Sequence, residues 1–115
     1  MSLQDIVIMI HNGEYGRAIS SLEVEASDKT RPPLERAEYC KWLAECYGRL
    51  EDPKSSGEWF LEAVKMVLSA GLQHKAKSEM ALPLCDKALD CYRQDGDSAD
   101  VLMVARLRQY VLSLK

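Results

Sequence analysis

The chain has 115 residues, a formal net charge of −3, 47% apolar residues and 29% charged residues. This length fits one domain, 1–115, and this composition is that of a folded globular protein rather than a disordered one. The negative charge disfavours nucleic-acid binding, which usually requires a basic surface. No apolar run approaches the roughly 20 residues of a membrane span, and no secretory signal pattern begins the chain. We therefore expect a cytoplasmic protein with no membrane or nucleic-acid partner, whose four cysteines are reduced thiols.

Six helices are predicted, because apolar residues recur at helical spacing and alternating, strand-like stretches are nearly absent. The predicted helices cover about 3–11, 14–27, 33–50, 53–70, 73–94 and 99–114. Turns that contain Gly, Asp or Pro join them over short distances. We therefore expect an all-α fold of antiparallel helix pairs.

Residues at the helix ends support these boundaries. Ser2 and Asp5 can form a capping box at the start of the first helix. Asp52 is suited to cap the fourth helix, and Asp97 or the serine after it to cap the sixth. Pro83 lies within the fifth and longest helix, where a proline removes one backbone hydrogen bond. A kink at Pro83, or a break into two helices, is therefore expected.

The helices repeat as pairs, since "AECYGRLED" nearly recurs later as "LDCYRQDGD". Tyr47 and Tyr92 lie 45 positions apart, and Cys40 and Cys85 share this offset. Met9 takes the place of the tyrosine in the first pair. The pattern predicts a solenoid in which the two tyrosines are mostly buried and placed alike. Its three helix-turn-helix units cover about 2–30, 31–71 and 72–115.

The middle unit, "KWLAECYGRLEDPKSSGEWFLEAV", resembles a tetratricopeptide repeat. Leu43, Ala44 and Tyr47 stand where the first helix of that repeat has Leu, Gly and Tyr, and Phe60 and Ala63 match its second helix. "NGEYGRAISSLE" is similar to the turn and second helix of another such repeat. The resemblance implies a right-handed α-α superhelix of about three units. It also implies a concave groove, lined by the first helix of each unit, that binds a protein or peptide.

The chain departs from this family in its spacing. Met9, Tyr47 and Tyr92 are 38 and 45 residues apart, whereas the family repeats every roughly 34 residues. We assign the surplus in the second interval to an extended fifth helix. Ser56 also replaces the small alanine that the family has early in the second helix of a repeat. The resemblance is therefore to a divergent, tetratricopeptide-like module.

The cysteines and histidines give little support for a metal, a cofactor or catalysis. Each pair of cysteines is six residues apart, whereas structural zinc sites usually have pairs two to four apart. Cys40 shares the apolar face of the third helix, so we interpret it as a small buried side chain. His11 and His74 lie at helix ends, and no nucleophile motif accompanies either of them. We expect no enzyme activity, metal or cofactor, although an enzyme or cofactor site hidden among the helices stays open as a rival.

The candidate binding groove begins with four residues of the third helix, Lys41, Trp42, Glu45 and Arg49. Trp42 suits either a ligand groove or packing between helices, since tryptophan is common at binding hot spots. The three charged residues, spaced four apart, form either a polar groove or a solvated ladder of ion pairs. From the later unit we expect the groove to include Asp86, Lys87, Asp90 and Arg93 or Gln94.

The resemblance does not imply one well-known binding mode of the family. Glu45 stands where the peptide-carboxylate clamps of the family carry an amide side chain. A clamp for chaperone C-termini is therefore not expected. The leading hypothesis is a non-catalytic interaction module of the adaptor, scaffold or co-chaperone type, with a protein or peptide partner in the groove.

The last helix supports a second hypothesis, self-assembly. "VLMVARLRQYVLSLK" contains ten apolar residues spread around the whole helix, although a helix packed on one side needs only an apolar stripe. We expect this helix to form a homodimer interface, to dock a partner or to continue into a further domain. The alternative is that the fifth helix covers part of the apolar surface of this last helix. The residues proposed for the interface are Val104, Leu107, Val111 and Leu114.

Overall fold

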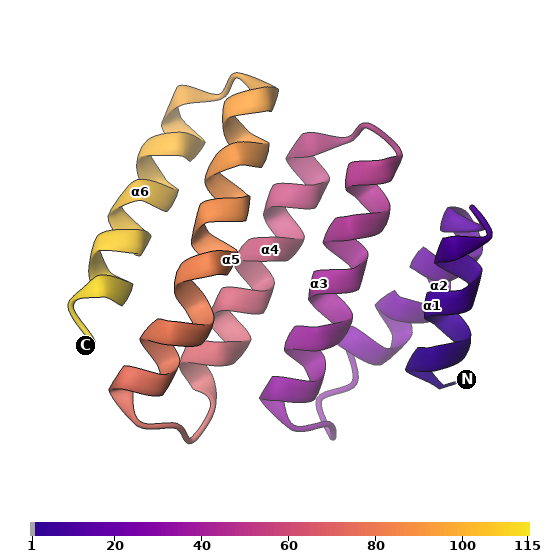
Figure 1. Ribbon diagram of the computed structural model, residues 1–115, viewed down its shortest axis with the longest axis horizontal. Helices are drawn as coiled ribbons and strands as arrows, with labels where there is room; N and C mark the ends of the chain where they lie inside the picture. The colour runs from indigo at the N-terminus through magenta and orange to yellow at the C-terminus, as the bar shows by residue number, and fades with distance from the viewer. Residues whose placement is uncertain (1) are drawn as a thin grey trace.

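A computed structural model describes residues 2–115 as six α-helices and the turns between them (Figure 1). The helices are α1 Leu3–His11, α2 Tyr15–Ala26, α3 Pro33–Arg49, α4 Pro53–Ser69, α5 His74–Asp95 and α6 Ser98–Leu112. No strand occurs among these described residues, so the predicted all-α class is confirmed. Within them, no helix is both long and apolar enough to cross a membrane.

The helix starts follow the expected capping chemistry. At α1 the Ser2 hydroxyl accepts a hydrogen bond from the Asp5 backbone N–H at 3.2 Å, and the Ser2 backbone N–H donates to the Asp5 carboxylate at 3.4 Å. Asp52 caps α4 by accepting from the backbone N–H of Ser55. Asp97 caps α6 by accepting from two backbone N–H groups. These side chains satisfy donors that every helix start leaves without an internal partner.

The turns that join the helices within each pair have a left-handed residue at equivalent positions. Gly13, Glu51 and Gly96 all have positive φ, of 79°, 59° and 82°, and lie 38 and then 45 positions apart. The residue after each of the first two turns donates its N–H to an equivalent carbonyl, that of Met9 or Tyr47, at 2.9 Å in both cases. The backbone thus repeats with the offsets that the sequence indicates.

Pro83 lies inside α5, which runs without interruption from His74 to Asp95. Of the two alternatives expected at Pro83, a kink or a break into two helices, the break does not occur. Because proline has no N–H, the carbonyl oxygen of Glu79 cannot receive the usual hydrogen bond from the residue four positions later. This backbone acceptor belongs to an exposed residue, which lowers the cost of leaving it without a helical partner.

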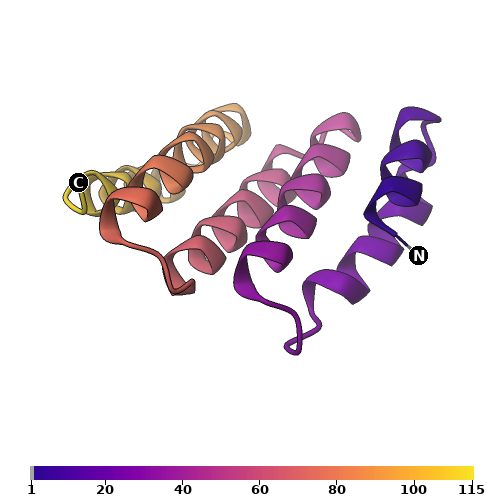
Figure 2. The same cartoon turned by 60° about the horizontal axis from the view of Figure 1, so that its bottom comes forward.

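Packing follows the order of the chain, and Figures 1 and 2 show the helices succeeding one another from the N-terminal end to the C-terminal end. Each helix packs on the next one, and α1 also packs on α3. The largest fully buried side chains come from all six helices: Ile6, Ile10, Leu22, Leu43, Val64, Val67, Cys85, Val104 and Val111 are among them. One continuous core therefore runs through the stack.

The two repeated tyrosines occupy similar places but are not buried alike. The Tyr92 side chain is 2% exposed, and its ring lies 3.1 Å from where a Cβ atom at Gly57 of α4 would be. Tyr47 is only half-buried, and its hydroxyl donates to Glu23 of α2 at 3.3 Å. Each tyrosine contacts the second helix of the preceding unit. The expected equivalence of position is thus met, and neither tyrosine is exposed; Tyr47 is buried less deeply than Tyr92, because its hydroxyl has a polar partner near the surface.

Candidate functional site

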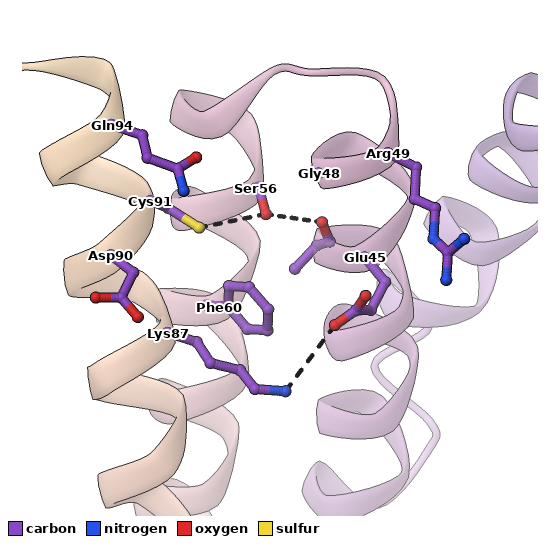
Figure 3. A pocket seen from close by; sticks show the side chains of 10 residues that line it. Glu45, Gly48, Arg49, Ser56, Phe60, Lys87, Asp90, Cys91 and Gln94 are labelled. Atoms are coloured by element: carbon purple, nitrogen blue, oxygen red, sulfur yellow. Dashed lines mark hydrogen bonds and ion pairs between the residues drawn. The ribbon is translucent and has the colours of Figure 1, made fainter.

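A groove separates α3 from α5, because both helices pack on α4 but, over the lengths described, not on each other. Its upper part is a hollow of about 480 Å³ (Figure 3). α3 and α5 form the two walls, and the side chains of Ser56 and Phe60 from α4 form the floor. The residues that line this part are Ala44, Glu45, Gly48, Arg49, Ser56, Phe60, Lys87, Asp90, Cys91 and Gln94.

The groove continues along α3 and α5 as two further hollows. One, of about 320 Å³, adds His11, Glu38, Lys41 and Trp42, and shares Glu45, Arg49, Phe60 and Lys87 with the first. The other, of about 280 Å³, shares Lys41 and Lys87 and is also lined by Val67, Glu79, Met80, Pro83 and Leu84. Since the three hollows share residues, we treat them as one surface, the α3–α5 groove.

Lys87 spans the middle of the α3–α5 groove (Figure 3). Its ammonium group lies 3.9 Å from the Glu45 carboxylate, on the opposite wall, and 5.6 Å from the centre of the Phe60 ring. Both charged side chains are about half exposed. An ion pair of that exposure contributes about 0 to 1 kcal/mol, so a ligand can displace Lys87 from the ring at small cost.

Ser56 ties the floor of the groove to both of its walls. Its hydroxyl donates to the backbone carbonyl of Ala44 in α3 at 2.7 Å, and the thiol of Cys91 in α5 donates to the Ser56 oxygen at 3.5 Å. A buried hydroxyl with two partners of this kind is satisfied and fixes the spacing of the helices that carry them. The serine that departs from the family pattern therefore has a structural role here.

The predicted ladder of ion pairs along α3 does not form. Lys41 pairs with Glu38 at 3.0 Å rather than with Glu45, and Glu45 faces Lys87. Arg49 makes no ion pair or side-chain hydrogen bond with any of the residues 2–115, and its side chain points away from Lys87 (Figure 3). The groove thus offers one guanidinium group that is exposed and available to an acidic ligand.

The four residues predicted on α3 do line the groove, as do Lys87, Asp90 and Gln94 of α5. Asp86 and Arg93 do not. The Asp86 carboxylate instead accepts a hydrogen bond from Arg108 of α6 at 2.7 Å. Arg93 lies seven residues after Asp86, hence on the same face of α5. This face turns toward α6 rather than toward α3, which corrects the prediction for both residues.

Residues that the sequence did not indicate as ligand-facing also line the groove. His11 lies at its edge, Ser56 and Phe60 form its floor, and Cys91 lies on its wall. The departure of Ser56 from the family pattern is the only signal that distinguishes any of them. Trp42 is half-buried, packs against the core and also lines the groove.

The residues proposed for a C-terminal interface are mostly inside the chain. Val104 and Val111 are 0% exposed within a single copy, so they cannot contact a second molecule. Leu107 and Leu114 are half-buried. The exposed apolar side chains of α6 are instead Leu102, Met103 and Tyr110. α6 therefore has apolar residues on two faces. The face that we predicted to form an interface is the one that packs on α5 within the chain.

Burial favours the neutral thiol form of the four cysteines, which is the less reactive form. Burial raises the pKa of Cys40, Cys46 and Cys85 to about 11, and burial also raises the pKa of Cys91. A thiol binds a metal or attacks an electrophile as its thiolate, which such pKa values suppress near neutral pH. The repeated cysteines therefore act as small apolar side chains in the stack.

The described chain contains one group of three possible metal-binding side chains, Asp95, Asp97 and Asp100. Hydrogen bonds from Asp100 and Ala99 lower the pKa of Asp97, as expected for a helix cap. Loss of hydration raises the pKa of Asp100, and the neighbouring Asp97 adds to this increase. Capping of α6 accounts for this arrangement, and we assign no metal to it.

Comparison of the sequence with protein-family models and with curated proteins, and of the structure with solved structures, gives no match. The tetratricopeptide resemblance and the right-handed superhelix that it implies therefore stay predictions from the sequence.

Proposed function

We propose that the chain is a non-catalytic interaction module that binds a segment of a partner protein in the α3–α5 groove. The observation that carries this proposal is the groove itself, which is continuous along two helices and combines aromatic side chains with charged walls. Its place between the first helices of two units is also the place that the tetratricopeptide resemblance implies. An adaptor or scaffold role follows from such a surface.

The dimensions of the groove suit a short peptide segment. α3 contains 17 residues, which corresponds to a length of about 25 Å at 1.5 Å per residue. A segment of about seven residues in an extended conformation has the same length. The groove is therefore long enough for a linear motif, and a single helix of two to four turns fits the same length.

The side chains of the groove define the chemistry of the segment. Trp42 and Phe60 offer aromatic surface for an apolar side chain, which enters once Lys87 moves aside. Arg49, without an internal partner among residues 2–115, suits a carboxylate. The carbonyl of Glu79, left without a helical donor by Pro83, lies in a residue that lines the lower groove and can accept a backbone N–H of the ligand. We propose a segment with apolar and acidic side chains.

A photo-crosslinking residue at position 94 tests the proposal. Gln94 is exposed and lines the groove, so a partner held in the groove should be crosslinked there and not from position 75, an exposed lysine on α5 that does not line it. The captured segment is then synthesised and its Kd measured with the purified chain. Trp42→Ala should weaken binding by at least about tenfold, and Arg49→Ala by about threefold or more.

The second tryptophan provides the matched control. Trp59 is also half-buried, but it lies on the opposite side of α4 in a hollow formed with Tyr92 and Met103. Trp59→Ala should leave the Kd within about twofold of the unchanged chain. Circular dichroism and thermal unfolding confirm that each variant is folded. Equal losses for the two tryptophan variants would contradict binding in the α3–α5 groove.

A further inference from the structure

The outer face of α6 corresponds to the face of α4 that receives the next helix. Both helices begin at a capping aspartate, Asp52 or Asp97. Counted from these caps, Leu102 is equivalent to Gly57, and Arg106 is equivalent to Leu61. In α4 these two positions are covered, and Gly57 lies against Tyr92 of α5. In α6, Leu102 is 52% exposed and Arg106 is exposed.

The opposite end of the molecule has a complementary open face on α1. The repeat offset of 38 makes Asp5 and Ile8 equivalent to Leu43 and Cys46 of α3. Leu43 and Cys46 are both 0% exposed, whereas Ile8 is 54% exposed and Asp5 is exposed. α3 has a preceding unit and α1 has none in this structure, so the difference in exposure marks the surface that a preceding unit would cover.

We propose that the chain associates with itself head to tail, with α1 of one copy packed on the outer face of α6 of another. The internal α4–α5 pair supplies the register for this contact. There Gly57 lies against Cys91 and Tyr92. In an antiparallel pair, the residue one turn further along α4, Leu61, lies opposite the residue one turn earlier in α5, Ala88.

Transferring this register to two copies brings complementary side chains together. Leu102 would face Ile8 and Met9, the equivalents of Cys91 and Tyr92. Arg106 would face Asp5, the equivalent of Ala88, and thus form an ion pair between copies. Leu102 is larger than Gly57, but Met9 is an unbranched and flexible side chain in place of the rigid Tyr92 ring. The apolar and the charged positions match in one and the same register.

A two-fold symmetric pair of α6 helices fits the same surface less well. Arg106 lies in the middle of the outer face, between Leu102 and Tyr110. Antiparallel packing of two such faces would bring two arginines together, and like charges in contact are unfavourable. A head-to-tail contact avoids this repulsion. It also leaves one free α6 face and one free α1 face in every dimer, so that larger rings or filaments form.

Two single substitutions that each block one end test the proposal, which is independent of ligand binding in the groove. Leu102→Asp places a carboxylate on the α6 face, and Ile8→Asp places one on the α1 face. Both original side chains are more than half exposed, so each variant should fold, as circular dichroism verifies. Sedimentation velocity from about 1 µM to about 500 µM covers the affinities expected of so small an interface.

The unchanged chain should gain mass with concentration and pass beyond the dimer. Each variant alone should stay monomeric, because its remaining open face finds only a blocked partner. An equimolar mixture should form one dimer and nothing larger, since the free α6 face of the Ile8→Asp chain binds the free α1 face of the Leu102→Asp chain. The two blocked faces repel each other and stay apart.

Three results would overturn the proposal. The first is a monomeric unchanged chain across the whole concentration range. The second is a dimer of the Ile8→Asp chain beside a monomeric Leu102→Asp chain, which indicates the two-fold α6 pair instead. The third is a mixture of the two variants that stays monomeric.

Discussion

The two helices α4 and α6 hold the same place in their units, but their surroundings differ. Each starts at a capping aspartate after a left-handed turn residue. α4 packs on both α3 and α5 and buries seven residues, whereas α6 packs on α5 and buries two. α6 is rich in apolar residues, yet three large ones, Leu102, Met103 and Tyr110, are exposed. Burial in this fold is therefore decided by the neighbours that a helix has, and only secondarily by its own sequence.

The largest expected difference between the covered face of α4 and the open face of α6 is in the effect of removing a tyrosine from each. Tyr92 covers α4 at Gly57 and is 2% exposed, whereas Tyr110 lies on the open face of α6 and is 56% exposed. Tyr92→Ala should lower the free energy of unfolding by about 3 to 5 kcal/mol, because it empties a packed site. Tyr110→Ala should change it by no more than about 0.5 kcal/mol. Urea unfolding at low protein concentration measures both, and similar losses would show that α6 is covered after all.

The pair Gly57 and Leu102 provides a second test, of intermediate size. A Cβ atom at Gly57 would lie 3.1 Å from the Tyr92 ring and 3.2 Å from Cys91 Cβ, closer than side-chain carbons normally approach. Gly57→Ala should therefore destabilise the chain by about 1 to 3 kcal/mol, although alanine favours helices. Leu102→Ala on the open face should change stability by about 0.5 kcal/mol or less. A stabilising Gly57→Ala variant would mean that α4 and α5 separate easily.

The smallest expected change in stability comes from substitutions in the turns before α4 and α6. Glu51 has φ of 59° and Gly96 has φ of 82°, and this region costs a side-chain-bearing residue energy that glycine avoids. Glu51→Gly should stabilise the chain by up to about 1 kcal/mol, and Gly96→Ala should destabilise it by about 1 kcal/mol. Thermal unfolding of the two variants measures both changes. The opposite sign for either would show that the turn adopts another conformation in solution.

Much of the fold could be predicted because the helix boundaries depend on residues close together in the sequence. α1 begins and ends where the sequence predicts, since Ser2 and Asp5 supply both bonds of its capping box. Capping by Asp52, with Pro53 after it, and by Asp97 fixes the starts of α4 and α6. Pro83 was harder to interpret, because a proline in a helix interior either breaks or merely interrupts the hydrogen bonding. Packing of α5 on α4 and α6, which is not local information, keeps this helix continuous.

The candidate site could be predicted on one wall and only in part on the other. On α3 the buried stripe leaves a single polar side, so Lys41, Trp42 and Glu45 fall in the groove. α5 is buried between α4 and α6, so its exposed residues divide between two edges. Sequence periodicity does not say which edge faces α3, and the ion pair of Asp86 with Arg108, 22 residues later, decides it.

Assignment of the inner and outer faces of α6 failed for a related reason. Apolar residues surround this helix, so its periodicity does not distinguish the packed side from the open one. The structure selects Val104 and Val111, seven residues apart, for the packed side. Counting from Asp97 by the repeat offset would have assigned Leu102 to the open side, since its equivalent in α4 faces the next unit.

The succession of helices, in which α1 with α3 is the one pair in residues 2–115 that packs without being consecutive, also sets how the chain folds. Most contacts close short loops, and proteins of such low contact order fold quickly. A stack of this kind opens from its ends, because the loss of an outer helix leaves the contacts of the central ones in place. Amide hydrogens of α4 should therefore exchange with solvent most slowly, and those of α1 and α6 earlier, in separate steps. Partly unfolded molecules that keep α3, α4 and α5 together are the natural intermediates of this chain.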